Sequence, residues 1–170
     1  MFKVNDRVVY GLTGVCQITD IAKEKYLDKE TEYYVLRPLF DKRTTIKTPV
    51  QNTKVAMRKI ISKEDVLSLI ETMPDKEMNW INDNNLRTEQ FKAALKTGKT
   101  EEWIKLIRTL YLKKQERVGM GKKLTKVDEN IMKTAEKQLH EEFAVVLNIS
   151  PDEVDRYISE HLPYNKKAIS

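Results

Sequence analysis

The sequence predicts a two-domain α+β protein, with a small β-barrel of about five strands first and an all-α domain of about five helices after it. Three observations support this prediction. The first sixty residues alternate apolar and polar positions and are rich in β-branched and aromatic side chains. From residue 62 onward, apolar residues recur with the helical period. The length of 170 residues suits two small domains, which we place at residues 1–60 and 61–170.

Five short β-rich segments make up the predicted barrel. In the first segment, Val4, Val8 and Tyr10 share one face of a strand. Glycines and short polar stretches separate the segments, as turns require. Pro49 has no N–H to donate to a ladder, so the fourth segment should lie at a sheet edge. The segments are residues 2–11, 14–22, 32–39, 44–50 and 53–60.

Capping residues mark the first two predicted helices. Ser62 followed by Asp65 resembles a capping box, and the apolar face that follows stops before Pro74. The second helix carries Phe91 on its apolar face and ends near Gly98, where glycine suits a left-handed cap.

Three further helices complete the predicted α-helical domain. The third opens at Thr100, and its apolar stripe is Trp103, Leu106, Ile107, Leu110 and Tyr111. The fourth opens at Thr125, with a stripe that runs from Val127 to Val146. The fifth opens at Ser150-Pro151, where serine suits the cap and proline the first helical position.

Composition narrows the class of protein. Apolar residues make up 40% of the chain and no run approaches the ~20 residues of a membrane span, so we expect a cytoplasmic protein without membrane contact. The single cysteine, Cys16, excludes an internal disulfide, and its apolar neighbours favour a buried structural thiol.

The sequence offers no catalytic or metal-binding constellation. Gly119-Met120-Gly121-Lys122 has neither the preceding strand nor the spacing of a phosphate loop. His140 and His161 stand apart from other metal ligands, and neither forms a recognisable nucleophile–base pair. We therefore expect a protein that is not an enzyme and that uses no metal, cofactor or small-molecule substrate.

Positive charge is concentrated in one block of the chain. Residues 86–126 hold 12 Lys or Arg against 4 Asp or Glu, a net +8, although the whole chain has a net charge of only +5. Residues 59–85 and 127–170 have net charges of −3 and −4. Such a block is typical of a surface that binds a polyanion, usually nucleic acid, and a solvated helix face is an equal alternative.

The two tryptophans have different sequence surroundings. Trp103 falls on a regular apolar stripe, so we expect it in the core. Trp80 precedes a run of polar residues, Asn82, Asp83, Asn84 and Asn85, and falls on no stripe. Its ring is therefore either an anchor at the edge of a core or an exposed group that a partner needs.

Both halves of the sequence resemble the CarD family of bacterial transcription regulators. The opening FKVNDRVVYGLTGVCQI is similar to the family's first domain and to the related polymerase-binding module of the transcription-repair coupling factor. MNW at residues 78–80 and LYLKKQERVGMGKKLTKVDENIMKTAEKQLHEEFAVVL are similar to its helical region. The resemblance covers about residues 1–162, with both halves in the same order.

The resemblance implies a two-part regulator that acts as a monomer. A Tudor-like (SH3-like) barrel would dock on the β subunit of RNA polymerase, and the helical domain would reach promoter DNA at the upstream edge of the melted bubble. Trp80 matches a tryptophan that wedges into the minor groove there, where a large apolar ring offsets part of the cost of unstacking. Because the wedge reads no base, sequence specificity should be weak.

The sequence departs from the family at several expected contacts. Asn82–Asn85 stand where well-known members have basic residues, and Glu24 falls near a position where some members carry an arginine. Lys47 matches a basic position implicated in polymerase contact, and an edge strand around it suits β-augmentation. A plain solvated edge is the alternative. The expected polymerase contacts are Thr44, Thr45, Ile46, Lys47 and Thr48; the expected DNA contacts are Trp80, Asn79, Arg87, Lys113, Lys114, Arg117, Lys122 and Lys123.

Two other functions stay open on the sequence alone. A protein–protein adaptor would use the barrel and the helical domain on two protein partners without touching DNA. A freestanding nucleic-acid-binding protein would need no polymerase. The +8 block favours DNA over the adaptor, because phosphate contacts make affinity steeply salt-dependent.

Overall fold

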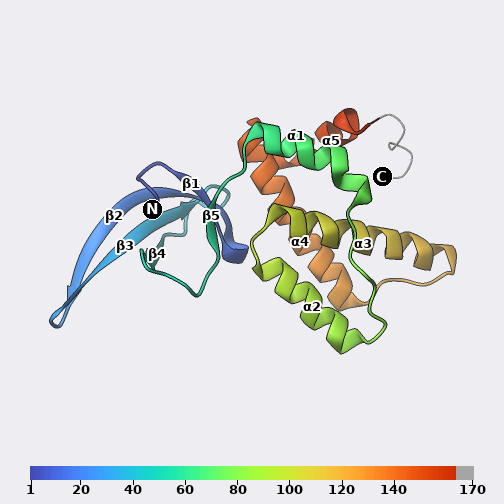
Figure 1. Ribbon diagram of the computed structural model, residues 1–170, viewed down its shortest axis with the longest axis horizontal. Helices are drawn as coiled ribbons and strands as arrows, with labels where there is room; N and C mark the ends of the chain where they lie inside the picture. Colours follow the sequence, from blue (N-terminus) through green and yellow to red (C-terminus); the bar gives the residue numbers. More distant parts are fainter. Residues whose placement is uncertain (164–170) are drawn as a thin grey trace. The chain divides into compact units, whose positions relative to one another are not determined.

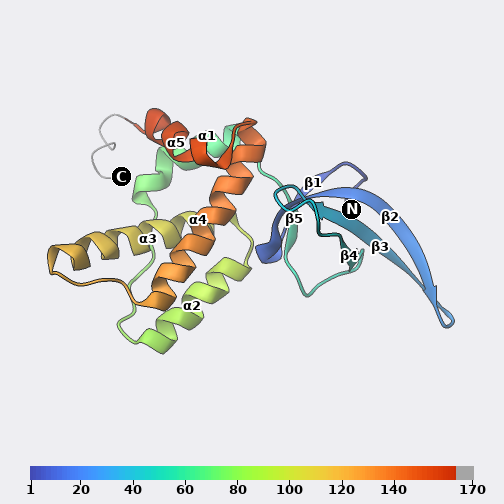
Figure 2. The ribbon, with the colours of Figure 1, turned by 180° about the vertical axis from the view of Figure 1, so that it is seen from behind.

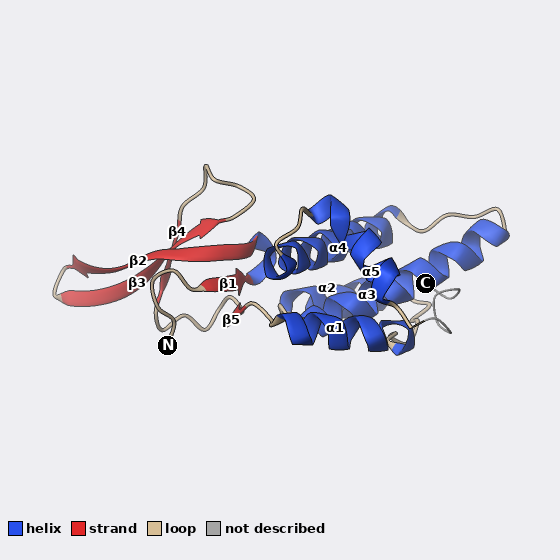
Figure 3. Ribbon diagram, turned by 90° about the horizontal axis from the view of Figure 1, so that it is seen from above, coloured by secondary structure: helices blue, strands red, loops and turns tan. Residues whose placement is uncertain are grey.

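A computed structural model describes residues 1–163 of the chain. The chain divides into two compact units, Met1–Ile60 and Ile61–Ser170, called here the sheet unit and the helical unit. Strands occupy the first and helices the second (Figure 3). The α+β class with five strands followed by helices is therefore confirmed, and each unit is described by itself below.

The sheet unit is one antiparallel sheet with the strand order β4-β3-β2-β1-β5 (Figure 1). Its residues form a five-stranded antiparallel fold consistent with a Tudor-like module. β4 and β5 are the two edges, so the prediction that Pro49 ends an edge strand is confirmed. The strands are β1 (Arg7–Tyr10), β2 (Gly14–Tyr26), β3 (Lys29–Pro38), β4 (Ile46–Pro49) and β5 (Met57–Lys59).

Apolar side chains from the middle strands form the core of the sheet unit. Val8 on β1 faces Cys16 on β2, and both are fully buried. Ile18 and Leu36 pair across β2 and β3 and are buried as well. The burial of Cys16 among these residues confirms the prediction of a structural thiol.

The β2–β3 hairpin is longer than the sequence analysis predicted. The charged residues after Ala22 were expected to leave the strand, but the ladder continues to the pair Tyr26 and Lys29. Lys23 lies opposite Glu32, and opposite charges across a ladder stabilise it in place of apolar packing. Leu27 closes the turn with a φ of 56°.

In the described part of the helical unit, residues 61–163, four α-helices pack around a fifth, α4. Figures 1 and 2 show α3 crossing α4, with α2 beside the first half of α4 and α1 and α5 beside its second half. The helices are α1 (Lys63–Thr72), α2 (Asn84–Lys96), α3 (Thr100–Gly119), α4 (Lys126–Leu147) and α5 (Val154–His161).

Local sequence signals explain where these helices begin and end. The Ser62 side chain accepts from the backbone N–H of Asp65 and the Asp65 carboxylate accepts from that of Ser62, which confirms the capping box. Gly98 follows α2 with a φ of 69°, as predicted for a left-handed cap. Ser150-Pro151 opens a short 3-10 turn, and α5 follows it directly.

The core of the helical unit is mostly apolar, but the predicted stripes do not account for every buried residue. Trp103 is fully buried, which confirms it as a core residue. Arg108, which lies outside the apolar stripe of α3, is buried. Val127 is exposed and its neighbour Asp128 is buried, because α4 turns the Asp128 carboxylate toward Arg87 of α2. Within residues 1–163, no helix is long and apolar enough to span a membrane.

Candidate functional site

Trp80 lies in the irregular segment that joins the end of α1 and its short 3-10 turn, Met73–Asp75, to the start of α2. The side chain is half-buried, so the ring is neither in the core nor free in solvent. Its edge contacts the buried Phe91 of α2, with ring centroids 6.1 Å apart and planes at 65°. Such an edge-to-face contact holds a ring in one place.

Three cations lie against the Trp80 ring. The guanidinium carbon of Arg87 is 4.4 Å from the ring centroid, the Nζ of Lys113 is 4.9 Å away and the guanidinium carbon of Arg117 is 5.6 Å away. These distances are those of cation–π contacts. The four side chains, called here the aromatic–cation cluster, come from the segment before α2, from α2 and from α3.

Arg87 has a different position from the one expected of a DNA contact. Its side chain is 1% exposed and its partner Asp128 is fully buried, with Nη2 2.8 Å from Oδ2. The expectation that Arg87 binds a DNA phosphate is corrected here, because a buried guanidinium already paired with a carboxylate is not available to a surface phosphate.

The polar run after Trp80 has structural partners. Asp83 caps α2 by accepting a hydrogen bond from the backbone N–H of Leu86 at 2.9 Å. The Asn84 side-chain oxygen accepts from Nη2 of Arg87 at 2.7 Å. Upstream, the backbone N–H of Met78 donates to Oγ1 of Thr109 on α3 at 2.7 Å. The segment that carries Trp80 is thus attached at both ends.

The remaining expected DNA contacts lie at the surface. Lys113 and Arg117 are half-buried on α3, where Lys113 also pairs with Glu116 at 3.4 Å. Arg117 donates from Nη1 to the backbone oxygen of Lys123 at 3.2 Å, which fixes the α3–α4 loop to the end of α3. Asn79, Lys114, Lys122 and Lys123 are exposed.

In the sheet unit, the expected polymerase contacts fall on and just before the edge strand β4. Thr44 and Thr45 precede the strand, and Thr44 bonds to Asp41 instead. Lys47 is exposed and pairs with Glu24 of β2, whose carboxylate raises the pKa of Lys47 by accepting its hydrogen bond. Thr48 is buried, so only its backbone is placed to meet a partner strand.

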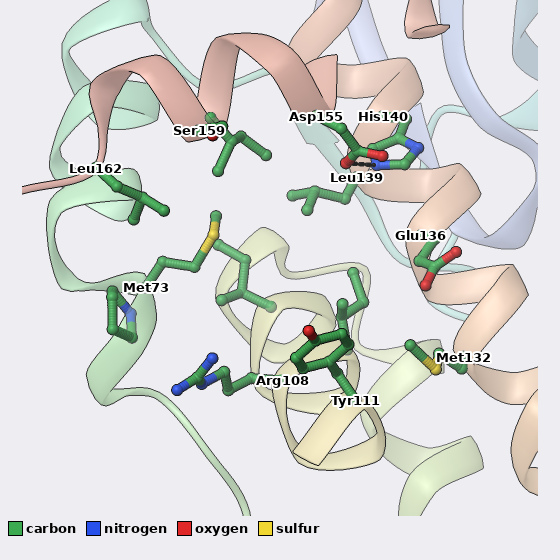
Figure 4. Close-up of a pocket in the computed structure, with 14 residues that line it drawn as sticks. Met73, Arg108, Tyr111, Met132, Glu136, Leu139, His140, Asp155, Ser159 and Leu162 are labelled. Carbon is green, nitrogen blue, oxygen red and sulfur yellow. Dashed lines mark hydrogen bonds and ion pairs between the residues drawn. The ribbon is translucent and has the colours of Figure 1, made fainter. Parts of the chain in front are cut away.

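The helical unit also contains a pocket of about 380 Å³, which Figure 4 shows. It is lined mainly by apolar side chains from α3, α4, α5 and the turn after α1. At its edge, His140 of α4 and Asp155 of α5 form an ion pair at 2.9 Å. The hydrogen bond to Asp155 raises the pKa of His140, and the same bond lowers the pKa of Asp155.

This pocket offers neither a metal site nor an evident catalytic pair. Among residues 1–163, no group of three or more His, Cys, Asp or Glu is placed to hold a metal ion. His140 pairs with a carboxylate, but no serine or cysteine nucleophile is bonded to its other side in the contacts described. Burial raises the pKa of Glu136 in the same pocket, which favours its neutral form.

Sequence reasoning missed the contacts that two further residues make to the aromatic–cation cluster. Asp128 looked like a helix-start residue, and its N–H does bond to Oγ1 of Thr125 at 3.1 Å, but its carboxylate pairs with Arg87. Phe91 was assigned to the core and also supports Trp80. The helical period of apolar residues predicts which side chains are buried. It does not predict that Asp128 contacts Arg87 or that Phe91 contacts Trp80.

Comparison with known protein families gives matches over both units. Residues 2–61 match the CarD-like/TRCF RID domain, and residues 65–159 match the CarD C-terminal domain. A Bacillus subtilis (strain 168) protein described as "Putative transcription factor YdeB" is 23% identical over 164 residues, which is 92% of this chain and 99% of that relative. The second match includes the whole aromatic–cation cluster.

Proposed function

Because this chain belongs to the CarD family of transcription regulators, we propose that it docks on the β subunit of RNA polymerase and stabilises the open promoter complex. The sheet unit supplies the docking and the helical unit contacts promoter DNA. Trp80 enters the minor groove at the upstream edge of the bubble, with contacts that carry little sequence specificity. The protein acts in the cytoplasm as a monomer and without catalysis.

The observation that carries this proposal is the position of Trp80 among cations. A large apolar ring at the surface, with Lys113 and Arg117 against it, combines the two groups that a melted fork requires. The cations suit phosphates and the ring suits an unstacked base step. Lys114, Lys122 and Lys123 are exposed as well and add positive charge to the surface of the helical unit.

The edge strand β4 supports the polymerase contact. Within the described residues β4 pairs with β3 along one side and has no strand on the other. A strand of a partner can therefore add to that side through backbone hydrogen bonds. Lys47 stands beside this edge with an exposed side chain, where it can pair with an acidic residue of the partner.

Two weak contacts on one chain are sufficient for such a regulator. When one unit holds polymerase, the other unit is kept at a high effective concentration near the promoter. Neither the polymerase contact nor the DNA contact then has to be strong by itself. This accounts for a DNA surface that has Asn82 and Asn85 where further lysines could stand.

One experiment with two full-length variants separates the two contacts. Trp80→Ala should remain bound to polymerase but shorten the lifetime of open complexes by about tenfold, the factor that corresponds to about 1.4 kcal/mol. Lys47→Glu should weaken retention on polymerase and leave the melting temperature unchanged. The matched control is Lys54→Glu, another exposed lysine of the sheet unit.

The outcomes distinguish the proposal from its rivals. If Trp80→Ala leaves the lifetime unchanged while Lys47→Glu weakens polymerase binding, the adaptor function is correct. If the wild-type protein binds DNA but is not retained on polymerase, a freestanding nucleic-acid-binding protein is correct.

A further inference from the structure

We propose that the buried Arg87–Asp128 ion pair is the device that positions Trp80 for the DNA, so that Arg87 is a positioning residue and not a phosphate contact. This inference rests on the proposed function for its consequence at the promoter. Its structural part, the control of the Trp80 ring by a buried pair, can be tested without DNA.

All five N–H groups of the Arg87 guanidinium have an acceptor. Nε donates to both carboxylate oxygens of Asp128 at 3.2 Å, and Nη2 donates to Asp128 at 2.8 Å and to Asn84 at 2.7 Å. Nη1 donates to the backbone oxygens of Ile81 at 2.8 Å and Asn82 at 3.4 Å. One side chain therefore joins α2, α4 and the segment that carries Trp80.

The two backbone contacts are to the two residues that follow Trp80 in the chain. Ile81 follows Trp80 in the chain, so the bond from Nη1 to its carbonyl fixes the Ile81–Asn82 peptide, one residue beyond the tryptophan. The same guanidinium lies 4.4 Å from the ring centroid, the shortest of the three cation distances. Arg87 thus holds both the ring of Trp80 and the backbone that follows it.

Burial assigns different roles to the three cations around the ring. Arg87 and Asp128 are 1% and 0% exposed, whereas Lys113 and Arg117 are half-buried. A buried pair generally contributes little net stability compared with apolar residues of similar volume, so a positioning role gives it a function. Lys113 and Arg117 can turn toward phosphates while Arg87 keeps the ring in place.

The chemistry of arginine is needed at this position. A lysine ammonium could pair with Asp128, but it has three donors on a single nitrogen and cannot span the carboxylate and two carbonyls in one plane. Arg87→Lys therefore keeps the positive charge and removes the planar set of N–H donors of the guanidinium. It is the variant that separates positioning from simple charge balance.

The emission of Trp80 reports its position directly. The chain has two tryptophans, so Trp103→Phe leaves Trp80 as the single tryptophan, whose emission can be excited apart from that of the tyrosines. In that background, Arg87→Lys should shift the Trp80 emission to longer wavelength and raise its quenching by acrylamide, because the ring leaves its contacts. In the otherwise native full-length chain, Arg87→Lys should shorten open-complex lifetime by about tenfold, as Trp80→Ala does.

Glu142→Gln is the matched control. Glu142 is also fully buried on α4 and accepts hydrogen bonds from Thr100 at 2.5 Å and from the backbone N–H of Ile61 at 3.2 Å. It lies about 21 Å along the helix from Asp128. Its loss should lower the melting temperature without changing Trp80 emission or open-complex lifetime. If Arg87→Lys does not fold, Asn84→Ala removes one acceptor and should give a smaller change in the same direction.

The results separate this inference from the proposed function. If Trp80→Ala shortens the open complex but folded Arg87→Lys changes neither emission nor lifetime, the positioning role is wrong and the proposed function stands. If Arg87→Lys shifts the emission while neither variant changes the lifetime, the positioning of the ring is correct and the proposed function is wrong. If Glu142→Gln changes Trp80 emission as much as Arg87→Lys does, the Arg87–Asp128 pair contributes only to the general stability of the helical unit and does not position Trp80.

Discussion

The two tryptophans of the helical unit show how one side chain takes different roles in different surroundings. Trp103 is fully buried on α3 and donates from its indole N–H to the backbone oxygen of Leu95 at 3.4 Å. Trp80 is half-buried between α2 and α3, with Phe91 at its edge and three cations against its ring. The first ring fills the core, and the second is held at the surface by charged groups.

This contrast indicates a role for the buried charges around Trp80. A core ring needs only apolar neighbours and one acceptor for its N–H. Trp80 has a buried ion pair, a capped helix start and a bonded segment around it. Apolar packing would stabilise a ring more simply, so this polar structure around a half-buried ring is consistent with the proposed contact between Trp80 and DNA.

Removing the Trp103 ring should have the largest effect on stability of the changes considered. It tests whether Trp103 is a core residue. Trp103→Ala should cost about 3–5 kcal/mol in the free energy of unfolding, because it leaves a cavity the size of an indole in the helical unit. Thermal unfolding followed by circular dichroism measures the loss. A variant that melts within a few degrees of the wild type would show that the ring is not essential to the core.

The same change at Trp80 should have a smaller effect on stability. Trp80→Ala removes an edge-to-face contact of about 0.5–1.5 kcal/mol and cation–π contacts of about 0.5–1 kcal/mol at a partly exposed site. We expect a total loss of about 1–2.5 kcal/mol, below that of Trp103→Ala. Equal losses for the two variants, measured in the same melts, would make Trp80 a core residue and remove the contrast.

The sequence predicted the frame of the molecule and missed the connections within the site. The helix start at Ser62 follows from local hydrogen bonding, and the burial of Trp103 follows from a regular stripe. The charged end of the β2–β3 hairpin was missed because cross-strand pairs such as Lys23 and Glu32 replace apolar packing. Local pattern does not record such partners.

Arg87 shows the same limit at the site. Arg87 was predicted to contact DNA together with the other basic residues of the +8 block, because a net charge does not distinguish a buried cation from an exposed one. Its burial depends on Asp128, which is 41 residues away in the chain. Trp80 itself could be selected from the sequence, because an aromatic residue off every stripe is informative, but the residues that hold it could not.

The cations beside Trp80 provide the third test. Replacing Lys113, Lys114 and Arg117 with alanine should weaken DNA binding and reduce the log–log salt slope by about 0.9 for each phosphate that is no longer neutralised. The matched control replaces Lys63, Lys133 and Lys137, which are exposed on α1 and α4. Binding titrations over a range of salt concentrations measure the slope. The same slope in both triple variants would mean that the charge around Trp80 is an ordinary solvated face.

A change of pH should have the weakest effect. It should weaken the packing of α5 on α4, where His140 pairs with Asp155, and leave the surroundings of Trp80 unchanged. The hydrogen bond to Asp155 raises the pKa of His140 above its ordinary 6.5, so its stabilisation is full below pH 6.5 and is lost as pH rises through the higher folded value. The pKa of Asp155 is lowered from 3.8, so its share is present above that pH and is lost as pH falls through the lower folded value.

The pair should therefore stabilise the packing of α5 on α4 most between about pH 4 and 6.5, and less as pH rises through the raised pKa of His140. Because the Asp155 side chain is 81% exposed, we expect less than about 1 kcal/mol. Glu136, with a pKa raised by burial, changes stability in the same direction and is present in both proteins.

Melting temperatures of wild type and Asp155→Asn at pH 6 and pH 8 should differ more at pH 6. In the Trp103→Phe background, Trp80 emission should stay constant over this pH range, because the aromatic–cation cluster contains no histidine. A shift in that emission would show that the His140–Asp155 pair and the aromatic–cation cluster are coupled.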